Sequence, residues 1–147
     1  MLALSIRQPY AELILRGIKT MEFRSRRTTL IGQRFYIYAA GKKWNGATAE
    51  ATAEATAEAK VAGKAGNSIW SRDVAAATAP PWMVELADAL RLFRHELPTG
   101  VIVGSAMIDA VTQRDDGMWQ WHLAGVERAK RLRKPARHPQ PAWFRPF

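Results

Sequence analysis

A lysine, a glutamate and an arginine near the start of the chain have the types and spacing to hold a phosphate group. They follow a glycine in the pattern G-x-K-x-x-E-x-R, at Lys19, Glu22 and Arg24. Lysine and arginine together can bind a phosphate, and a neighbouring carboxylate can accept hydrogen bonds from the exocyclic amine of a base. The alternative is a structural ion pair between Glu22 and Arg24 on a solvated strand face, and the spacing leaves both interpretations open.

A second group of residues combines aromatic rings with positive charge in the last third of the chain. Trp119, Trp121 and Trp143 stand near a basic run at 128–137. Aromatic rings stack on bases while cations hold the nucleic-acid backbone, although the alternation of Trp119 and Trp121 favours core positions for those two. The cations expected to face nucleic acid here are Arg131, Arg133 and Lys134, and the same surface is expected to extend through Arg7, Arg26, Arg27, Arg34, Lys42 and Lys43.

Other familiar chemistries have no counterpart in the sequence. The chain has no cysteine, which excludes a disulfide framework, a thiolate zinc site and a cysteine nucleophile. Its three histidines, His95, His122 and His138, are far apart in sequence, and no glycine-rich phosphate loop is present. The sequence therefore predicts neither a metal nor a cofactor.

The charge is high and unevenly distributed. There are 22 Lys and Arg residues against 13 Asp and Glu, giving a net charge of +9. Residues 1–48 carry nine basic and two acidic side chains (+7), 49–97 carry five and seven (−2), and 98–147 carry eight and four (+4). Two basic ends favour a polyphosphate partner through counterion release, and the alternative is a basic protein kept soluble by its charge.

The elements that must position these residues can be read from the hydrophobic pattern. A helix over 10–16, with Gly17 as its C-cap, follows a first strand at 1–6. Gly104, inside the most apolar strand, indicates a bend or a close backbone approach. Five or six strands with flanking helices predict a small mixed α+β barrel. The further strands are expected at 19–25, 33–40, 100–112, 119–123 and 143–144, and a second helix at 81–96.

Residues 1–147 are expected to form a single domain interrupted by a low-complexity insertion at about 46–66. The insertion contains three copies of Ala-Thr-Ala-Glu at 47–58 and offers no strong apolar face, so we expect a solvated helix or loop without a direct functional role. No stretch approaches the roughly 20 apolar residues that span a bilayer, and the N-terminus lacks a cleavage site. These features predict a cytoplasmic protein without membrane contact.

The segment from Gly17 to Arg24 resembles the signature of the ASCH domain, a branch of the PUA-like superfamily. The preceding residues Leu4 to Tyr10 resemble the same family's entry into its first helix. The resemblance resumes at 100–109 and 119–123 and ends at Trp143, so it covers nearly the whole chain outside the insertion.

This resemblance implies a PUA-like β-barrel with a helix beside a cleft that receives a nucleotide or RNA. Carried over by position, Lys19, Glu22 and Arg24 line that cleft. The expected function is a nucleic-acid-binding module, acting as a monomer on RNA or another single-stranded nucleic acid, with a modified nucleoside as a further ligand.

Two other functions remain open. Some small ASCH proteins are amidohydrolases that deacetylate N4-acetylcytidine with a lysine, a threonine and a glutamate, and ribonuclease activity is also associated with the domain. Here Lys19 matches the lysine, whereas Glu22 occupies the threonine position and Thr20 does not. Lys19 with Glu22 as a base would carry metal-independent hydrolysis. The third function is a protein-interaction adaptor.

Overall fold

The structure, a computed structural model, describes residues 1–40, 85, 88–90 and 97–147. The chain divides into two units, one formed by Met1–Ala40 and Thr99–Phe147 and the other by Gly41–Pro98. The repeats and the whole insertion lie outside the described residues, as does most of the helix predicted at 81–96. Of that predicted helix, Glu85, Asp88 and Ala89 are described as helical. The elements below all belong to the first unit.

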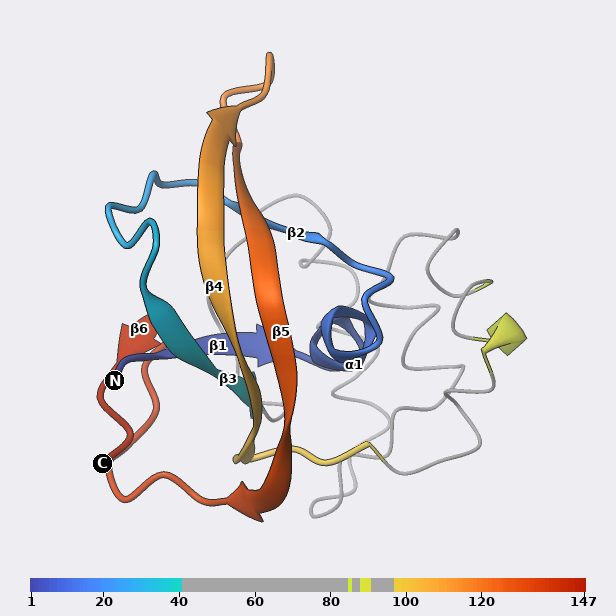
Figure 1. The fold of residues 1–147 in the computed structure, drawn as a ribbon, viewed down its shortest axis with the longest axis vertical. Coiled ribbons are helices and arrows are strands. Elements are labelled where there is room, and N and C mark those ends of the chain that lie inside the picture. Colours follow the sequence, from blue (N-terminus) through green and yellow to red (C-terminus); the bar gives the residue numbers. More distant parts are fainter. Residues whose placement is uncertain (41–84, 86–87, 91–96) are drawn as a thin grey trace, which may run out of the picture. The chain divides into compact units, whose positions relative to one another are not determined.

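In the described part of the chain, six strands form one sheet in the order β2-β5-β4-β3-β1-β6 (Figure 1). All neighbouring strands are antiparallel except β1 and β3, which are parallel. The long β4–β5 hairpin dominates the sheet, and its turn and its open end lie at opposite ends of the molecule's first unit. The strands are β1 (Ala3–Arg7), β2 (Met21–Arg24), β3 (Arg34–Ala40), β4 (Val101–Gln113), β5 (Trp119–Arg133) and β6 (Trp143–Phe144).

The helix α1 (Tyr10–Leu15) follows β1 directly and carries a buried stripe. Its apolar residues Ala11 and Ile14 join Leu4, Phe35 and Ile37 in the core of the sheet. The helix ends where Gly17 takes a positive φ of 72°, which only glycine adopts without strain. The predicted helix and its glycine stop are confirmed.

Gly104 in β4 is the place where α1 contacts the sheet most closely. A Cβ atom at this position would collide with the backbone carbonyl of Glu127 and with the side chain of Leu15. The register between β4 and β5 also shifts next to Gly104, from the pair Ile102–Arg133 to the pair Gly104–Arg128. The close approach predicted for this glycine is confirmed.

The sheet is open and strongly curled. Strands four places apart in a flat sheet are about 19 Å apart. Trp121 of β5 and Trp143 of β6 are four places apart, yet their rings stack with centroids 5.7 Å apart and planes 9° apart. Arg24 of β2 likewise reaches the backbone of Ser5 in β1. Side chains thus join the two ends of the sheet.

The predicted closure into a barrel is not found in the described strands. The last strand, β6, has two residues and pairs with β1, and β2 pairs with β5, so no backbone ladder joins the ends. A two-residue strand is too short to provide a second ladder. The six predicted strands are confirmed in the described residues, whereas the sheet that they form is open, with little helix beside it.

The strand boundaries agree with the sequence predictions within about two residues, with one exception. The strand expected at 119–123 continues to Arg133. Its second half, rich in lysine and arginine, pairs with β4 as far as Ile102. No helix in the described residues has the length and apolar character needed to cross a bilayer.

Candidate functional site

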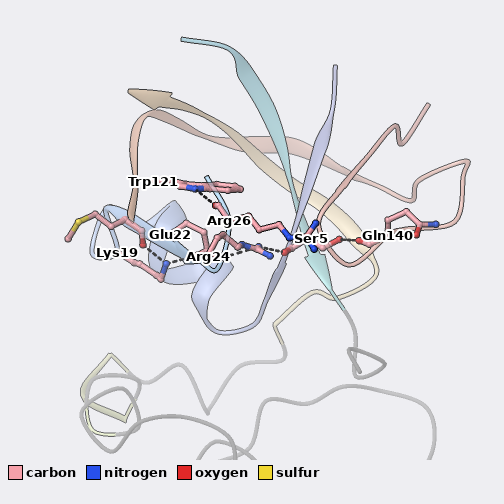
Figure 2. A network of polar contacts seen from close by, with 8 residues as sticks. Ser5, Lys19, Glu22, Arg24, Arg26, Trp121 and Gln140 are labelled. Atoms are coloured by element: carbon pink, nitrogen blue, oxygen red, sulfur yellow. Dashed lines mark hydrogen bonds and ion pairs between the residues drawn. The ribbon is translucent and has the colours of Figure 1, made fainter. Parts of the chain in front are cut away.

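Lys19, Glu22 and Arg24 form one ionic cluster, which we call the KER cluster (Figure 2). Lys19 Nζ donates to Glu22 Oε2 at 2.6 Å and also to the carbonyl oxygen of Met21. Arg24 Nη2 lies 3.1 Å from Glu22 Oε1. Each oxygen of the carboxylate therefore holds a different cation, and Glu22 sets the distance between the two positive charges.

The cluster is largely shielded from solvent, because β2 turns its polar face inward. The side chains of Lys19 and Glu22 are 11% exposed and that of Arg24 is 18% exposed. Glu22 lies opposite Trp121 in the β2–β5 register, and Arg24 lies opposite Trp119. The alternative of an ion pair on a solvated strand face does not fit this burial.

The inner side of the cluster rests on stacked tryptophans. The Arg24 guanidinium lies 5.9 Å from the centre of the Trp121 ring, and Trp121 stacks on Trp143. Trp121 Nε1 donates to the carbonyl oxygen of Arg26 at 3.2 Å, which ties the chain after β2 to the core. Trp121 is buried, as its alternation predicted, so it supports the arginine and does not itself face a ligand.

Arg24 connects the cluster to the opposite end of the sheet. Its Nη2 donates to the carbonyl oxygen of Ser5 at 2.8 Å, and the Ser5 hydroxyl donates to the carbonyl oxygen of Gln140. Figure 2 shows this continuous path from Lys19 to Gln140. Arg24 Nε is buried and has no hydrogen-bond partner among the described residues. A buried N–H without a partner costs about 1–3 kcal/mol.

Tyr10, the first residue of α1, lies beside the cluster. Lys19 Nζ is 5.8 Å from the centre of its ring. Burial raises the pKa of the Tyr10 hydroxyl above its ordinary value, the charge of Arg7 opposes this rise, and the charge of Glu22 adds to it. Tyr10 is therefore an uncharged hydrogen-bonding group next to the two cations at neutral pH.

The remaining predicted cations lie partly around the KER cluster and partly at the far end of β5. Arg7 ends β1 with an intermediate exposure, and Arg26 is exposed just after β2. Arg131 lies ten residues along β5 from Trp121, which is about 30 Å in an extended strand. Figure 1 shows that β2 adjoins the half of β5 near the hairpin turn, away from the end with Arg131, Arg133 and Lys134.

Within that distant group, the Arg133 guanidinium stacks on Phe147, 3.9 Å from the ring centre. Arg131 and Lys134 are exposed. They lie at the other end of β5 from the residues that pair with β2. The predicted Lys42 and Lys43 lie outside the described residues.

Arg34, predicted on the same basic surface, serves the sheet instead. Its Nη1 donates to Ser105 Oγ at 3.0 Å and to the carbonyl oxygen of Gly125 at 2.9 Å, while Nη2 lies 3.2 Å from Glu127 Oε1. These contacts cross β4 and join β3 to β5, next to a glycine whose φ is 55°. Arg27, by contrast, is exposed, with its guanidinium 5.9 Å from the Trp119 ring.

Sequence reasoning missed a second ionic cluster, formed by Glu12, Arg16 and Arg128. Arg128 donates to both oxygens of Glu12, at 3.0 and 2.8 Å, and Arg16 Nε donates at 2.8 Å. Burial acts to raise the pKa of Glu12, but these hydrogen bonds and charges outweigh it and lower that pKa below its ordinary value. The i,i+4 spacing of Glu12 and Arg16 was the available signal.

No group of three or more histidines and carboxylates that could bind a metal ion is found in the described parts of the chain. The two carboxylates of the ionic clusters, Glu12 and Glu22, are each bonded by arginine or lysine.

Comparison with known proteins gives one finding. A family model described as the ASCH domain matches residues 4–134, which include both ionic clusters, the strands β2 to β5 and all of β1 except Ala3. No curated protein matches the chain.

Proposed function

The chain belongs to the ASCH domain family, and we propose that it is an RNA-binding module whose ligand site is built on the KER cluster. ASCH domains are in general RNA-binding domains of the PUA-like type. The finer assignment, a basic cleft beside α1 that receives a nucleotide of single-stranded RNA, is our proposal.

The arrangement of the two cations carries this proposal. Glu22 bonds Lys19 and Arg24 with separate oxygens, so the cluster keeps a formal charge of +1 at a largely buried position. Holding two cations in place in advance reduces the entropy lost when they bind a ligand.

The surroundings of the cluster also suit a nucleotide. The Arg24 guanidinium is steadied by the Trp121 ring, and Tyr10 supplies a neutral hydroxyl on the α1 side. Arg7 and Arg26 stand at the ends of the strands that carry the site, where further phosphates of a strand would pass. A charge-assisted contact to a phosphate is about twice as strong as a neutral one.

Hydrolysis of RNA or of an acylated cytidine is the second candidate, and the 2.6 Å contact between Lys19 and Glu22 favours it. A general base must have an oxygen within reach of the proton it removes. Both oxygens of Glu22 are already bonded to cations, an arrangement better suited to positioning them than to taking up a proton. We therefore rank binding above hydrolysis.

Affinity measurements on matched arginine variants test the proposal. Arg24→Gln should weaken binding of a short single-stranded RNA about tenfold or more, since it removes a largely buried charged contact. The matched control is Arg131→Gln, which removes the same charge from an exposed position at the far end of β5 and should cost less than about threefold. Equal losses for both variants, or no RNA binding by the wild type, would refute the proposal.

Turnover separates the two candidate functions. The Glu22→Gln variant of a binding module should still bind RNA, with an altered base preference, and the wild type should cleave nothing. Metal-free cleavage of RNA or release of acetate from N4-acetylcytidine by the wild type, abolished in Glu22→Gln with affinity retained, would establish hydrolysis instead. Circular dichroism must show a native fold for every variant.

A further inference from the structure

Phe23 stands out on the outer face of β2. It is flanked in sequence by Glu22 and Arg24, whose side chains point inward, and its own side chain is 37% exposed. Successive strand residues alternate between faces, so Phe23 shares the outer face with its register partner Gln120. An aromatic residue that is more than a third exposed at the edge of a sheet leaves apolar surface that a stacked ligand would cover.

Two cations lie against this ring. Lys19 Nζ is 5.5 Å and the Arg114 guanidinium 5.6 Å from its centre. Arg114 comes from the turn between β4 and β5, where it pairs with Asp116 at about half exposure. Lys19 belongs to the KER cluster as well, so it connects the inner and outer faces of β2.

A row of polar side chains continues the outer face next to Phe23. Thr112 of β4 lies opposite Gln120 of β5, and its hydroxyl is 3.2 Å from Gln120 Oε1 and 2.8 Å from His122 Nε2. His122 in turn lies opposite Met21, two residues before Phe23 on the same face of β2. Amide and imidazole groups carry the donors and acceptors that read the edges of unpaired bases.

From this arrangement we infer a second nucleotide subsite on the outer face, in which one unpaired RNA base stacks on Phe23. Arg114 and Lys19 would hold the adjoining phosphates, and Gln120 with His122 would contact the base edge. A ring between two cations matches both parts of a nucleotide, since bases stack on aromatic rings and phosphates seek positive charge. The inference rests on the proposed RNA binding and adds a site that the KER cluster does not contain.

The central experiment replaces the ring by an aliphatic side chain or by a larger aromatic ring. Phe23→Leu should weaken binding of a single-stranded RNA octamer about tenfold, and Phe23→Trp should bind at least as well as wild type. For an octamer of the same length built from abasic nucleotides, wild type and Phe23→Leu should bind equally. Ile31→Ala, at a similarly exposed apolar side chain, is the matched control and should change affinity less than twofold.

Salt dependence examines the phosphate contact separately and does not depend on the folding of the Phe23 variants. Arg114→Gln should reduce the slope of log affinity against log salt by about one unit, whereas Phe23→Leu should leave the slope unchanged. An unchanged slope in Arg114→Gln would refute its phosphate contact.

The outcomes distinguish this subsite from the proposed function. If wild type binds the octamer and Phe23→Leu binds it equally well, the subsite is refuted and RNA binding stands. If wild type binds no RNA, the proposed function fails and the subsite with it. An equal loss for the abasic octamer would show that Phe23 only positions Lys19, which contradicts stacking. Dimers of wild type that disappear in Phe23→Leu, detected by sedimentation, would show that another strand pairs with the edge at β2, which also overturns the inference.

Discussion

Replacing Glu22 by glutamine tests whether the KER cluster is held together by its buried carboxylate. Removing one partner of a fully buried ion pair costs about 3–5 kcal/mol, because the other charge is left uncompensated. Here the three side chains are 11–18% exposed, and water can partly stabilise the remaining charges. In this variant Lys19 still donates a hydrogen bond to the carbonyl oxygen of Met21, and Arg24 still donates one to the carbonyl oxygen of Ser5.

These compensations reduce the expected loss for Glu22→Gln to about 2–3 kcal/mol in the free energy of unfolding. For a chain of this length the loss corresponds to a fall of roughly 8 °C in Tm. Urea denaturation followed by circular dichroism gives the free energy, and an unchanged m value would show that the native state stays compact.

A matched control is available at Glu127, whose carboxylate pairs with Arg34 at 3.2 Å but is 69% exposed. Glu127→Gln should cost less than about 0.5 kcal/mol, as exposed pairs usually do. The double variant Lys19→Met/Glu22→Gln should lose less free energy of unfolding than the two single variants lose together, by about 1 kcal/mol or more. A cost for Glu22→Gln as small as that of Glu127→Gln would refute the view that the cluster is buried and mutually dependent.

Three further predictions follow from the packing and the second ionic cluster. Gly104→Ala should lower the free energy of unfolding, measured in urea, by about 2–3 kcal/mol, because the added Cβ would collide with the backbone of Glu127. An unchanged free energy of unfolding would contradict the close approach. The lowered pKa of Glu12 means that its charged form stabilises the fold above pH 4.5, its ordinary value, and that this contribution is lost as pH falls through the folded-state pKa. Wild-type Tm should therefore fall more steeply than that of Glu12→Gln in acid, and parallel curves would count against the prediction. Arg34→Met should lower the free energy of unfolding by about 1–2 kcal/mol and change RNA affinity less than about threefold. A larger loss of affinity would show that Arg34 contacts the RNA.

Much of the fold could be predicted from local signals. The alternation around Met21 and the apolar run through Gly104 marked strands, and Gly17 marked the end of α1, all close to their observed places. The second half of β5 was missed because Glu127, Arg128 and their basic neighbours lack an apolar strand pattern. That segment pairs with β4 and is partly held by the contact from Arg128 to Glu12, which no local pattern shows.

The site could be predicted only in part. The spacing identified Lys19, Glu22 and Arg24, yet alternation alone does not say which face of a strand turns inward. Hydropathy would bury Phe23, whereas the structure buries Glu22, because two cations and the tryptophans behind them compensate its charge. The separation of Arg131 and Lys134 from the KER cluster depends on the length of β5, which the sequence pattern underestimated.

Mapping a short single-stranded RNA onto the protein by amide NMR tests the central claim most directly. If RNA binds at the KER cluster, the largest shifts should fall on the amides of residues 19–24 and on the indole N–H of Trp121, which bonds the backbone beside β2. The amides around Arg131, at the far end of β5, should move little at moderate salt, since salt screens charges that lie more than about 10 Å apart. Shifts confined to the far end of β5, or none at all, would contradict the account.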